Sequence, residues 1–244
     1  AVGLVGFDGD LPLQLEGETH ASGTTRVLEL TRETQQFRFV NVPRAPVPSL
    51  LRDFSAPVIV EYSYSDDELA FLSAQDSDGF NRWEAVQRLA LARLLRLTDE
   101  VENGQDPTSI DDLFIGTLRT LLRDESLSPA FRELALTLPS EAFIGEQRAI
   151  VDPSAIRPAR RALARVIGRR LADDWHHIYS TLGTPGEYSP AAGPAGRRAL
   201  RNLALAYLAE AEVEGAEPMV RRQLDEATNL TDRHAALTAL INSR

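Results

Sequence analysis

The first quarter of the chain alternates apolar and polar residues with the period of a β-strand. Runs rich in β-forming residues occupy positions 2–7, 11–15, 24–31, 36–40 and 57–62, and Asp8-Gly9 is a turn signal after the first run. Prolines at 43, 46, 48 and 57 exclude a central strand or helix there and indicate a fixed extended segment. We predict that residues 1–63 form part of an antiparallel β-sandwich.

From residue 64 onward the apolar positions recur with a helical period. Ser65 and Glu68 have the spacing of a capping box, and the clearest helix follows at 80–97. Further helices are predicted at 109–124, 129–136, 139–150, 153–182, 195–212, 217–227 and 232–241, with breaks at 103–107 and in the Gly- and Pro-rich segment 183–196. No repeat has a fixed period. We therefore predict that residues 64–244 form an irregular antiparallel stack of helices, superhelical in the manner of HEAT or armadillo domains.

Composition narrows the range of functions. The chain has 244 residues and a formal net charge of −10, which argues against a nucleic acid or an anionic membrane as partner. It contains no Cys, so disulfides and thiolate metal sites are excluded, and all 26 of its basic residues are Arg. No apolar run has the length of a membrane span and no signal peptide is visible, so we expect a cytoplasmic protein. The missing initial Met leads us to expect that the sequence starts inside a longer protein.

Residues with the spacing of a catalytic or metal site are not found. A zincin helix needs two His four residues apart with a Glu between them, whereas His176 and His177 are adjacent and His20 and His234 are remote in sequence. We interpret all four as structural or surface residues. A G-x-S-x-G elbow and a phosphate-binding glycine loop are also absent. We predict no catalytic, cofactor-binding or metal-binding residue, and if zinc were found, His176, His177 and the nearby Asp173 and Asp174 would be the first to test.

Three other groups of residues have a structural interpretation that we prefer to a functional one. An arginine row on the predicted helix 153–182 is typical either of an anion-binding surface or of a solvated face balanced by Asp173, Asp174 and other acids, and the acidic chain favours the second. Trp83 and Trp175 are expected to be core anchors. Near the end, Asn229, Thr231 and Asp232 are expected to form the N-terminal cap of a helix, in which Thr231 or Asp232 accepts a backbone N–H. The arginine row on the predicted helix 153–182 consists of Arg157, Arg160, Arg161, Arg165, Arg169 and Arg170.

Two blocks resemble one family of enzymes. Residues 47–87, VPSLLRDFSAPVIVEYSYSDDELAFLSAQDSDGFNRWEAVQ, and residues 225–240, DEATNLTDRHAALTAL, are similar to bacterial aminopeptidase N, a zinc metallopeptidase of the gluzincin class. The resemblance covers nearly the whole chain and is looser between 103 and 196. Leu230 stands where the family usually has Met, a change that nearly conserves volume. The family's H-E-x-x-H zinc helix and its Gly-x-Met-Glu-Asn motif do not occur here.

The resemblance implies a non-catalytic piece of such an enzyme. It implies that residues 1–63 end a β-domain, and that residues 64–244 begin the helical domain that walls an enclosed chamber. Zinc and the catalytic domain would belong to the full-length parent, and peptide substrate would meet this piece only there. We expect no activity from the chain alone, and self-association through apolar surface exposed at its ends. The main alternative is a helical interaction scaffold that binds a partner protein. An independent hydrolase has the least support.

Overall fold

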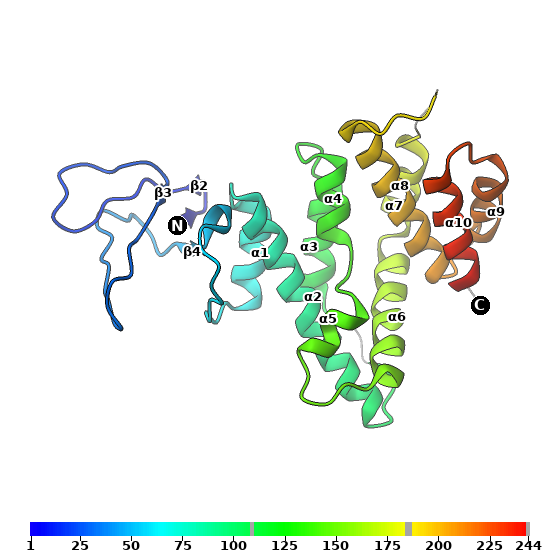
Figure 1. The fold of residues 1–244 in the computed structure, drawn as a ribbon, viewed down its shortest axis with the longest axis horizontal. Coiled ribbons are helices and arrows are strands. Elements are labelled where there is room, and N and C mark those ends of the chain that lie inside the picture. Colours follow the sequence, from blue (N-terminus) through cyan, green and yellow to red (C-terminus); the bar gives the residue numbers. More distant parts are fainter. Residues whose placement is uncertain (108–109, 184–186, 243–244) are drawn as a thin grey trace. The chain divides into compact units, whose positions relative to one another are not determined.

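The computed structural model describes residues 1–107, 110–183 and 187–242 (Figure 1). The chain forms two compact units, residues 1–89 and residues 90–244. The first unit holds a small sheet and the start of the helical region, and the second unit is made of helices. This arrangement confirms the fold class expected from the sequence, a β part followed by an irregular helical stack.

The sheet of the first unit is organised around strand β1 (Val2–Gly6). This strand pairs antiparallel with β2 (Gly9–Asp10), β3 (Thr25–Arg26) and β4 (Val47–Leu50). The β4 pairing places Val2 opposite Leu50 and Val5 opposite Val47. Leu4 and Val5 are buried, so the first predicted strand is confirmed and supplies the core of the sheet.

The other predicted strands are shorter than expected or absent. Of the run 24–31 only Thr25–Arg26 is a strand; runs 11–15 and 36–40 meet at one isolated bridge between Leu15 and Phe39; and 57–62 has no strand. Alternation marks residues that can face a core, but a ladder also needs a partner over several residues, which is not a local property. The prolines were predicted to exclude a central strand, and β4, which lies in this segment with Pro48 opposite Leu4, is an edge strand. Among the described residues β4 pairs only with β1, and a strand with one partner tolerates Pro.

The first helices begin as the sequence predicts. Helix α1 (Asp66–Gln75) starts at Ser65, whose Oγ accepts from the Glu68 amide at 3.2 Å while the Glu68 carboxylate accepts from the Ser65 amide at 2.7 Å. This is the predicted capping box. Helix α2 (Gly79–Glu102) follows and ends at the predicted break. The remaining helices are α3 (Asp112–Arg123), α4 (Pro129–Leu136), α5 (Glu141–Glu146), α6 (Pro153–Arg170), α7 (Ala172–Thr181), α8 (Ala192–Glu210), α9 (Ala216–Glu226) and α10 (Leu230–Asn242).

Several helix boundaries differ from the prediction. The segment 153–182 is two helices, because the chain bends at Leu171 (φ −116°, ψ 21°) between α6 and α7. Basic residues end α6 and acidic residues begin α7, a charge pattern that favours this break. Helix α8 begins inside the predicted loop 183–196, with Pro194 in its first turn, where proline is tolerated; residues 184–186 lie outside the description. Helix α5 is shorter than the predicted helix 139–150. Helix α3 begins after its cap Asp111, whereas the prediction began at Ser109, which lies outside the described residues.

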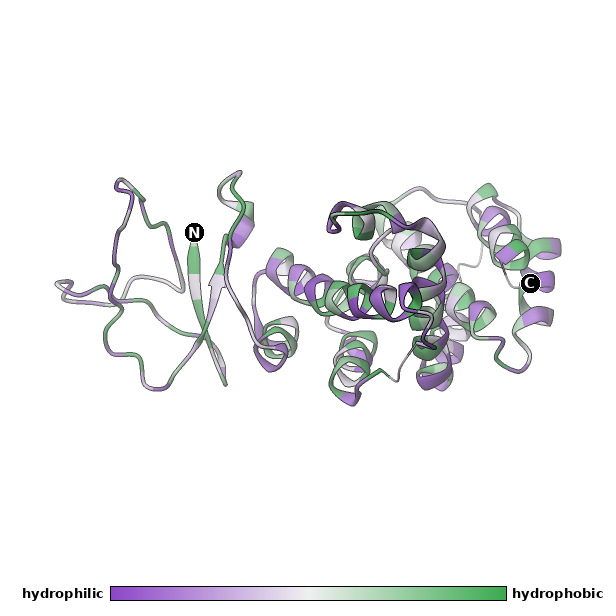
Figure 2. Ribbon diagram, turned by 90° about the horizontal axis from the view of Figure 1, so that it is seen from below, coloured by the Kyte–Doolittle hydropathy of each residue, from purple (hydrophilic) through white to green (hydrophobic). Residues whose placement is uncertain are grey.

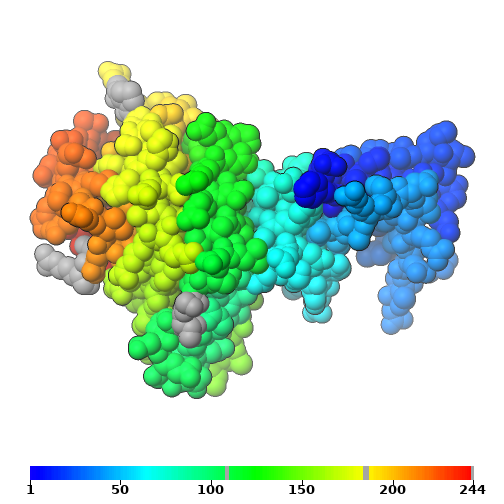
Figure 3. All heavy atoms as spheres, turned by 180° about the vertical axis from the view of Figure 1, so that it is seen from behind, coloured from blue at the N-terminus to red at the C-terminus, as the bar shows by residue number. Residues whose placement is uncertain are grey.

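Helix α8 is the centre of the second unit and packs against α4, α6, α7 and α10. In Figure 3 the yellow residues of α7 and α8 lie directly against the green residues of α3 and α4. The helices mix hydrophobic and hydrophilic residues along their length (Figure 2). A Cβ on Gly168 would lie 2.3 Å from the backbone oxygen of Tyr207, so α6 and α8 approach more closely than any side chain at 168 allows. No helix in the described residues is both long and apolar enough to cross a membrane.

Candidate functional site

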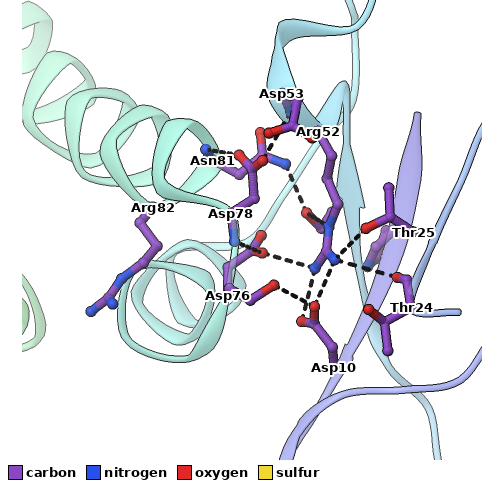
Figure 4. Close-up of polar contacts among 12 residues, drawn as sticks. Asp10, Thr24, Thr25, Arg52, Asp53, Asp76, Asp78, Asn81 and Arg82 are labelled. Atoms are coloured by element: carbon purple, nitrogen blue, oxygen red, sulfur yellow. Dashed lines mark hydrogen bonds and ion pairs between the residues drawn. The ribbon is translucent and has the colours of Figure 1, made fainter.

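The most elaborate polar site in the described residues surrounds Arg52 in the first unit (Figure 4). Its side chain is 2% exposed, and it points between Asp10 of β2 and Asp76 at the end of α1. The two terminal nitrogens donate to the two oxygens of Asp10 at 2.7 and 2.8 Å, a bidentate ion pair. One of them also donates to Asp76 at 2.8 Å, and the other to Thr25 Oγ1 at 3.0 Å. Nε donates to Ser49 Oγ at 2.8 Å, so all five guanidinium donors have acceptors.

A second layer of hydrogen bonds fixes the partners of Arg52. Asp76 Oδ1 also accepts from the Asp78 amide at 2.9 Å. Asp78 in turn caps the start of α2 by accepting from the Asn81 amide at 2.8 Å, and it accepts from the Asp53 amide at 2.9 Å. The Asn81 side chain donates to Ser49 Oγ at 2.7 Å. The strands, the turn after β4 and the ends of α1 and α2 are therefore held by one network, which we call the Arg52 network.

Burial and charge act in opposite directions on the acids of this network. Burial favours the neutral form of Asp10, but the hydrogen bonds from Arg52 and Ser77 outweigh it and lower the pKa of Asp10. For Asp76 burial dominates and raises the pKa, although hydrogen bonds from Ser49 and the Asp78 amide and the charge of Arg52 oppose it. Asp76 Oδ2 is buried and has no partner among the described residues. Asp10 is therefore the principal counterion of Arg52, and Asp76 is the more easily protonated acid.

The backbone is shaped to admit this arginine. A Cβ on Gly3 would lie 2.1 Å from Cζ of Arg52, so only glycine at this position lets the guanidinium lie against β1. Leu51 and Asp53, on either side of Arg52, both have φ of 56°, in the left-handed region that non-glycine residues adopt at a cost. Such strain persists only where the surroundings fix the conformation. The network and the strained turn are therefore one unit that orients segments of the chain.

Sequence reasoning did not single out these residues. Ser49, Arg52, Asp76, Asp78 and Asn81 all lie within 47–87, the block that carried the family resemblance, and that concentration of polar residues was the available signal. The charge pattern alone does not show which acid meets Arg52, because Asp10 lies 42 residues away in the sequence.

The histidines and neighbouring acids do not come together. His20, His177 and His234 are exposed and His176 is half-buried. In the part of the chain that the structure describes, no three His, Cys, Asp or Glu side chains are grouped as metal ligands usually are. Asp174 pairs with Arg119 and Arg123 of α3 at 3.5 and 2.6 Å. That no residue of this chain binds a metal or cofactor or catalyses a reaction stays a prediction.

The arginine row of α6 contacts neighbouring helices. Arg161 and Arg165 share Glu210 of α8, at 2.8 and 3.0 Å, which confirms that the two lie on one face. Arg170 pairs with Asp112 at 2.6 Å, and the guanidiniums of Arg160 and Arg169 donate to backbone oxygens. The expectation that Asp173 and Asp174 balance the row was wrong for Asp174, which pairs with α3. The acids of adjacent helices hold these arginines because α8 and α3 lie closer to them.

The remaining candidates have structural positions. Trp175 is fully buried and stacks on Tyr207 with ring centroids 4.8 Å apart, which confirms a core role, whereas Trp83 is half-buried beside Phe80. At the start of α10 the cap is Asn229, whose Oδ1 accepts from the Asp232 amide at 2.9 Å. The expected caps Thr231 and Asp232 were wrong, because both already lie inside the helix, and Asp232 instead accepts from Asn202 of α8 at 2.9 Å.

The second unit has a groove of about 420 Å³ between α6, α8 and α10. Arg157 and Arg161 of α6, Tyr207 of α8 and His234 of α10 line it. The Tyr207 hydroxyl donates to the Leu136 carbonyl at 2.7 Å, so that hydroxyl is engaged. The groove has room for a side chain or a short peptide.

Comparison with known proteins identifies relatives that extend beyond this sequence. The chain is 38% identical to aminopeptidase N of Escherichia coli over 231 residues, and 32% identical to that of Caulobacter vibrioides over 246 residues. These matches cover 95% and 99% of this chain and 26% of each relative. The structure is similar to that of Legionella pneumophila aminopeptidase A in complex with aspartic acid, with a TM-score of 0.79 and 25% identity over 98% of this chain and 27% of that one. The resemblance to bacterial aminopeptidase N is thereby confirmed, and the chain spans about a quarter of the length of these relatives.

Two family models divide the chain between them. Residues 8–63 match a domain of unknown function with an Ig-like fold, DUF3458, and residues 66–244 match a domain of unknown function with ARM repeats, DUF3458_C. The strands and the helical stack described above agree with these two descriptions. The chain belongs to the DUF3458_C family of ARM-repeat domains, preceded by an Ig-like DUF3458 part.

Proposed function

We propose that this chain is the spacer and part of the chamber wall of a bacterial zinc aminopeptidase N, and that it is not catalytic by itself. The observation that carries the proposal is the pattern of coverage, because homology extends over 87–99% of this chain but only 24–26% of three aminopeptidase N relatives. In the proposed parent, zinc held by another part of the polypeptide would activate a water for attack on the peptide carbonyl. The parent then removes N-terminal residues from peptides, and this piece meets substrate only in the assembled enzyme.

The two parts of the chain have different proposed roles, spacer and chamber wall. We place the boundary between residues 63 and 64, which the two family matches at 8–63 and 66–244 support. Within the first unit, the Arg52 network ties the first helices to the sheet. A cytoplasmic location and the lack of nucleic-acid and membrane partners are parts of the same proposal, and fractionation of the source organism tests the first.

The test compares the 244-residue chain with the full-length protein that contains it. We expect the full-length protein to contain zinc and to cleave an alanyl chromogenic substrate, and the isolated chain to do neither. Metal content and turnover are measured on the same samples, and addition of zinc controls for metal loss during purification. Stoichiometric zinc with turnover in the isolated chain would overturn the proposal.

An interaction scaffold is the second candidate, and the groove between α6, α8 and α10 favours it. The association state in solution distinguishes a chamber-wall fragment from an interaction scaffold. Leu230, Leu237 and Ile241 expose 79%, 44% and 65% of their surface and lie on one stripe of α10, so a wall fragment should self-associate through them. Sedimentation of Leu237→Gln should show weaker association than wild type, with Leu134→Gln, an equally apolar exposed site on α4, as the matched control. A monomer at all concentrations would favour the scaffold.

A further inference from the structure

Arg132 of α4 is buried without a counterion. Its surface is 6% exposed, and its Nη1 donates to the Leu122 carbonyl at 3.0 Å. Its Nε is buried and has no partner in the described part of the chain, and no carboxylate there forms an ion pair with it. Burial lowers the pKa of Arg132, while the more distant charges of Glu125 and Asp124 oppose that shift. An unpaired buried guanidinium is costly, so an acceptor for it is to be expected.

The side chain of Arg132 lines a cavity of about 650 Å³ in the second unit, which we call the Arg132 cavity. Its charged lining consists of Arg123, Arg132 and Arg197 against Asp174 and Glu125, together with the exposed His177. Its apolar lining is contributed by Leu122, Leu127, Pro129, Ile178 and Leu182. Apart from His177, three guanidiniums face two carboxylates, so these groups together carry one excess positive charge.

Of the other charged groups of the lining, Asp174 and Arg197 are already engaged, whereas Glu125 is exposed to solvent. Asp174 accepts from Arg123 at 2.6 Å and also pairs with Arg119, so it is not available to Arg132. Arg197 donates to the Thr181 carbonyl at 3.2 Å at the end of α7. Arg132 itself uses one donor on a carbonyl at the end of α3, a common role for Arg at a helix C-terminus. That role leaves the buried Nε–H unexplained.

We propose that the Arg132 cavity binds a small organic monocarboxylate, with the carboxylate on the Arg132 guanidinium and an apolar body against Leu122 and Ile178. A guanidinium edge donates two parallel hydrogen bonds to a carboxylate. One excess positive charge matches the charge of a monoanion better than that of a phosphate dianion. The apolar lining has nothing to offer an inorganic ion. This inference does not depend on the aminopeptidase assignment, because the binding is to the chain itself.

The experiment uses the 244-residue chain and a matched pair of probes. N-acetyl-leucine carries the carboxylate and an apolar body at pH 7, and N-acetyl-leucinamide has nearly the same shape without the charge. We expect calorimetric titration at low ionic strength to show saturable one-to-one binding of the acid, and at least tenfold weaker binding of the amide. Equal binding of the two, or no binding of the acid, would overturn the proposal.

Two substitutions test whether the acid binds at Arg132. Arg132→Met should weaken binding of the acid at least tenfold, whereas Arg221→Met, an exposed arginine of α9 outside the cavity, should leave it unchanged. If Arg132→Met does not fold, the Nε–H resonance of Arg132 in the wild-type protein must shift on addition of the acid and stay in place with the amide. Inorganic phosphate is the third probe, and tighter binding of phosphate than of the acid would refute the monocarboxylate class.

Discussion

The close approach of α6 and α8 at Gly168 gives a prediction whose magnitude follows from the coordinates. In Gly168→Ala the new Cβ would lie 2.3 Å from the Tyr207 backbone oxygen and 2.5 Å from the Ala211 Cβ. The first distance is about 1.1 Å below the 3.4 Å at which ordinary contact begins. A backbone oxygen cannot rotate away as a side chain can, so α8 must move, and α8 packs against four other helices.

The free energy of unfolding should fall by about 2 kcal/mol. Overpacking of this kind costs about 1–3 kcal/mol or more, and the higher helix propensity of Ala returns about 1 kcal/mol. The control is Gly116→Ala in α3, where a new Cβ meets no atom within 4 Å. The chemical change is the same, so this variant should gain about 0.5–1 kcal/mol. The two substitutions are therefore expected to have opposite signs and to differ by about 3 kcal/mol.

Urea unfolding followed by the fluorescence of Trp175 is the suitable assay, because its ring stacks on Tyr207, the residue that the new methyl group would strike. Trp83→Phe in all variants removes the signal of the other tryptophan. The unfolding midpoint should fall in Gly168→Ala and rise in Gly116→Ala, with unchanged slopes. If Gly168→Ala is as stable as Gly116→Ala, the helices do not approach as described and the reasoning is refuted.

Two further predictions concern polar contacts of the second unit. Tyr207→Phe removes the donor to the Leu136 carbonyl, which lies at 2.7 Å in a buried position, so urea unfolding should show a loss of about 1–3 kcal/mol, and an unchanged midpoint would contradict that contact. Asp111 accepts a hydrogen bond from Arg93 at 2.9 Å. Burial would raise the pKa of Asp111, but the hydrogen bonds from Arg93 and the Phe114 amide outweigh burial and lower this pKa from 3.8. Its ionised form therefore stabilises the fold above pH 4, and this effect is lost as the pH falls further. Wild type should be more stable than Asp111→Asn by about 1–2 kcal/mol at pH 7, and this difference should become smaller in acid. A difference that is constant with pH would contradict the prediction.

Local signals predicted the helices well. The capping box at Ser65 and the helix 129–136 have the predicted bounds, because a cap and a period of 3.6 residues are properties of neighbouring residues. The strands were predicted poorly, because the bridge between Leu15 and Phe39 depends on residues far apart in the sequence. The break at Leu171 was missed because apolar periodicity continues across it, although the charges on either side mark it.

The polar sites could not be predicted for a related reason. Nothing in the sequence around Arg52 distinguishes it from Arg132, since each is one arginine among 26 basic residues. Whether a guanidinium is satisfied depends on acids that the fold brings to it, and Asp10 and Asp76 are 42 and 24 residues from Arg52. The sequence thus supplies the donors, and only tertiary structure supplies the acceptors.

Arg52 and Arg132, two of the buried arginines of the described residues, lead to opposite conclusions when their donors and acceptors are counted. Arg52 has acceptors for all five donors, a bidentate counterion and a glycine placed to admit it, so its burial is complete without a ligand. A satisfied buried ion pair adds little to stability over an apolar replacement, which makes orientation of the first helices on the sheet the better account of its presence. Arg132 is buried to a similar degree, but its charge has no counterion among the described residues and its Nε–H has no acceptor. Its contact with the Leu122 carbonyl leaves the positive charge without a counterion, and the monocarboxylate that we propose for the Arg132 cavity would supply one.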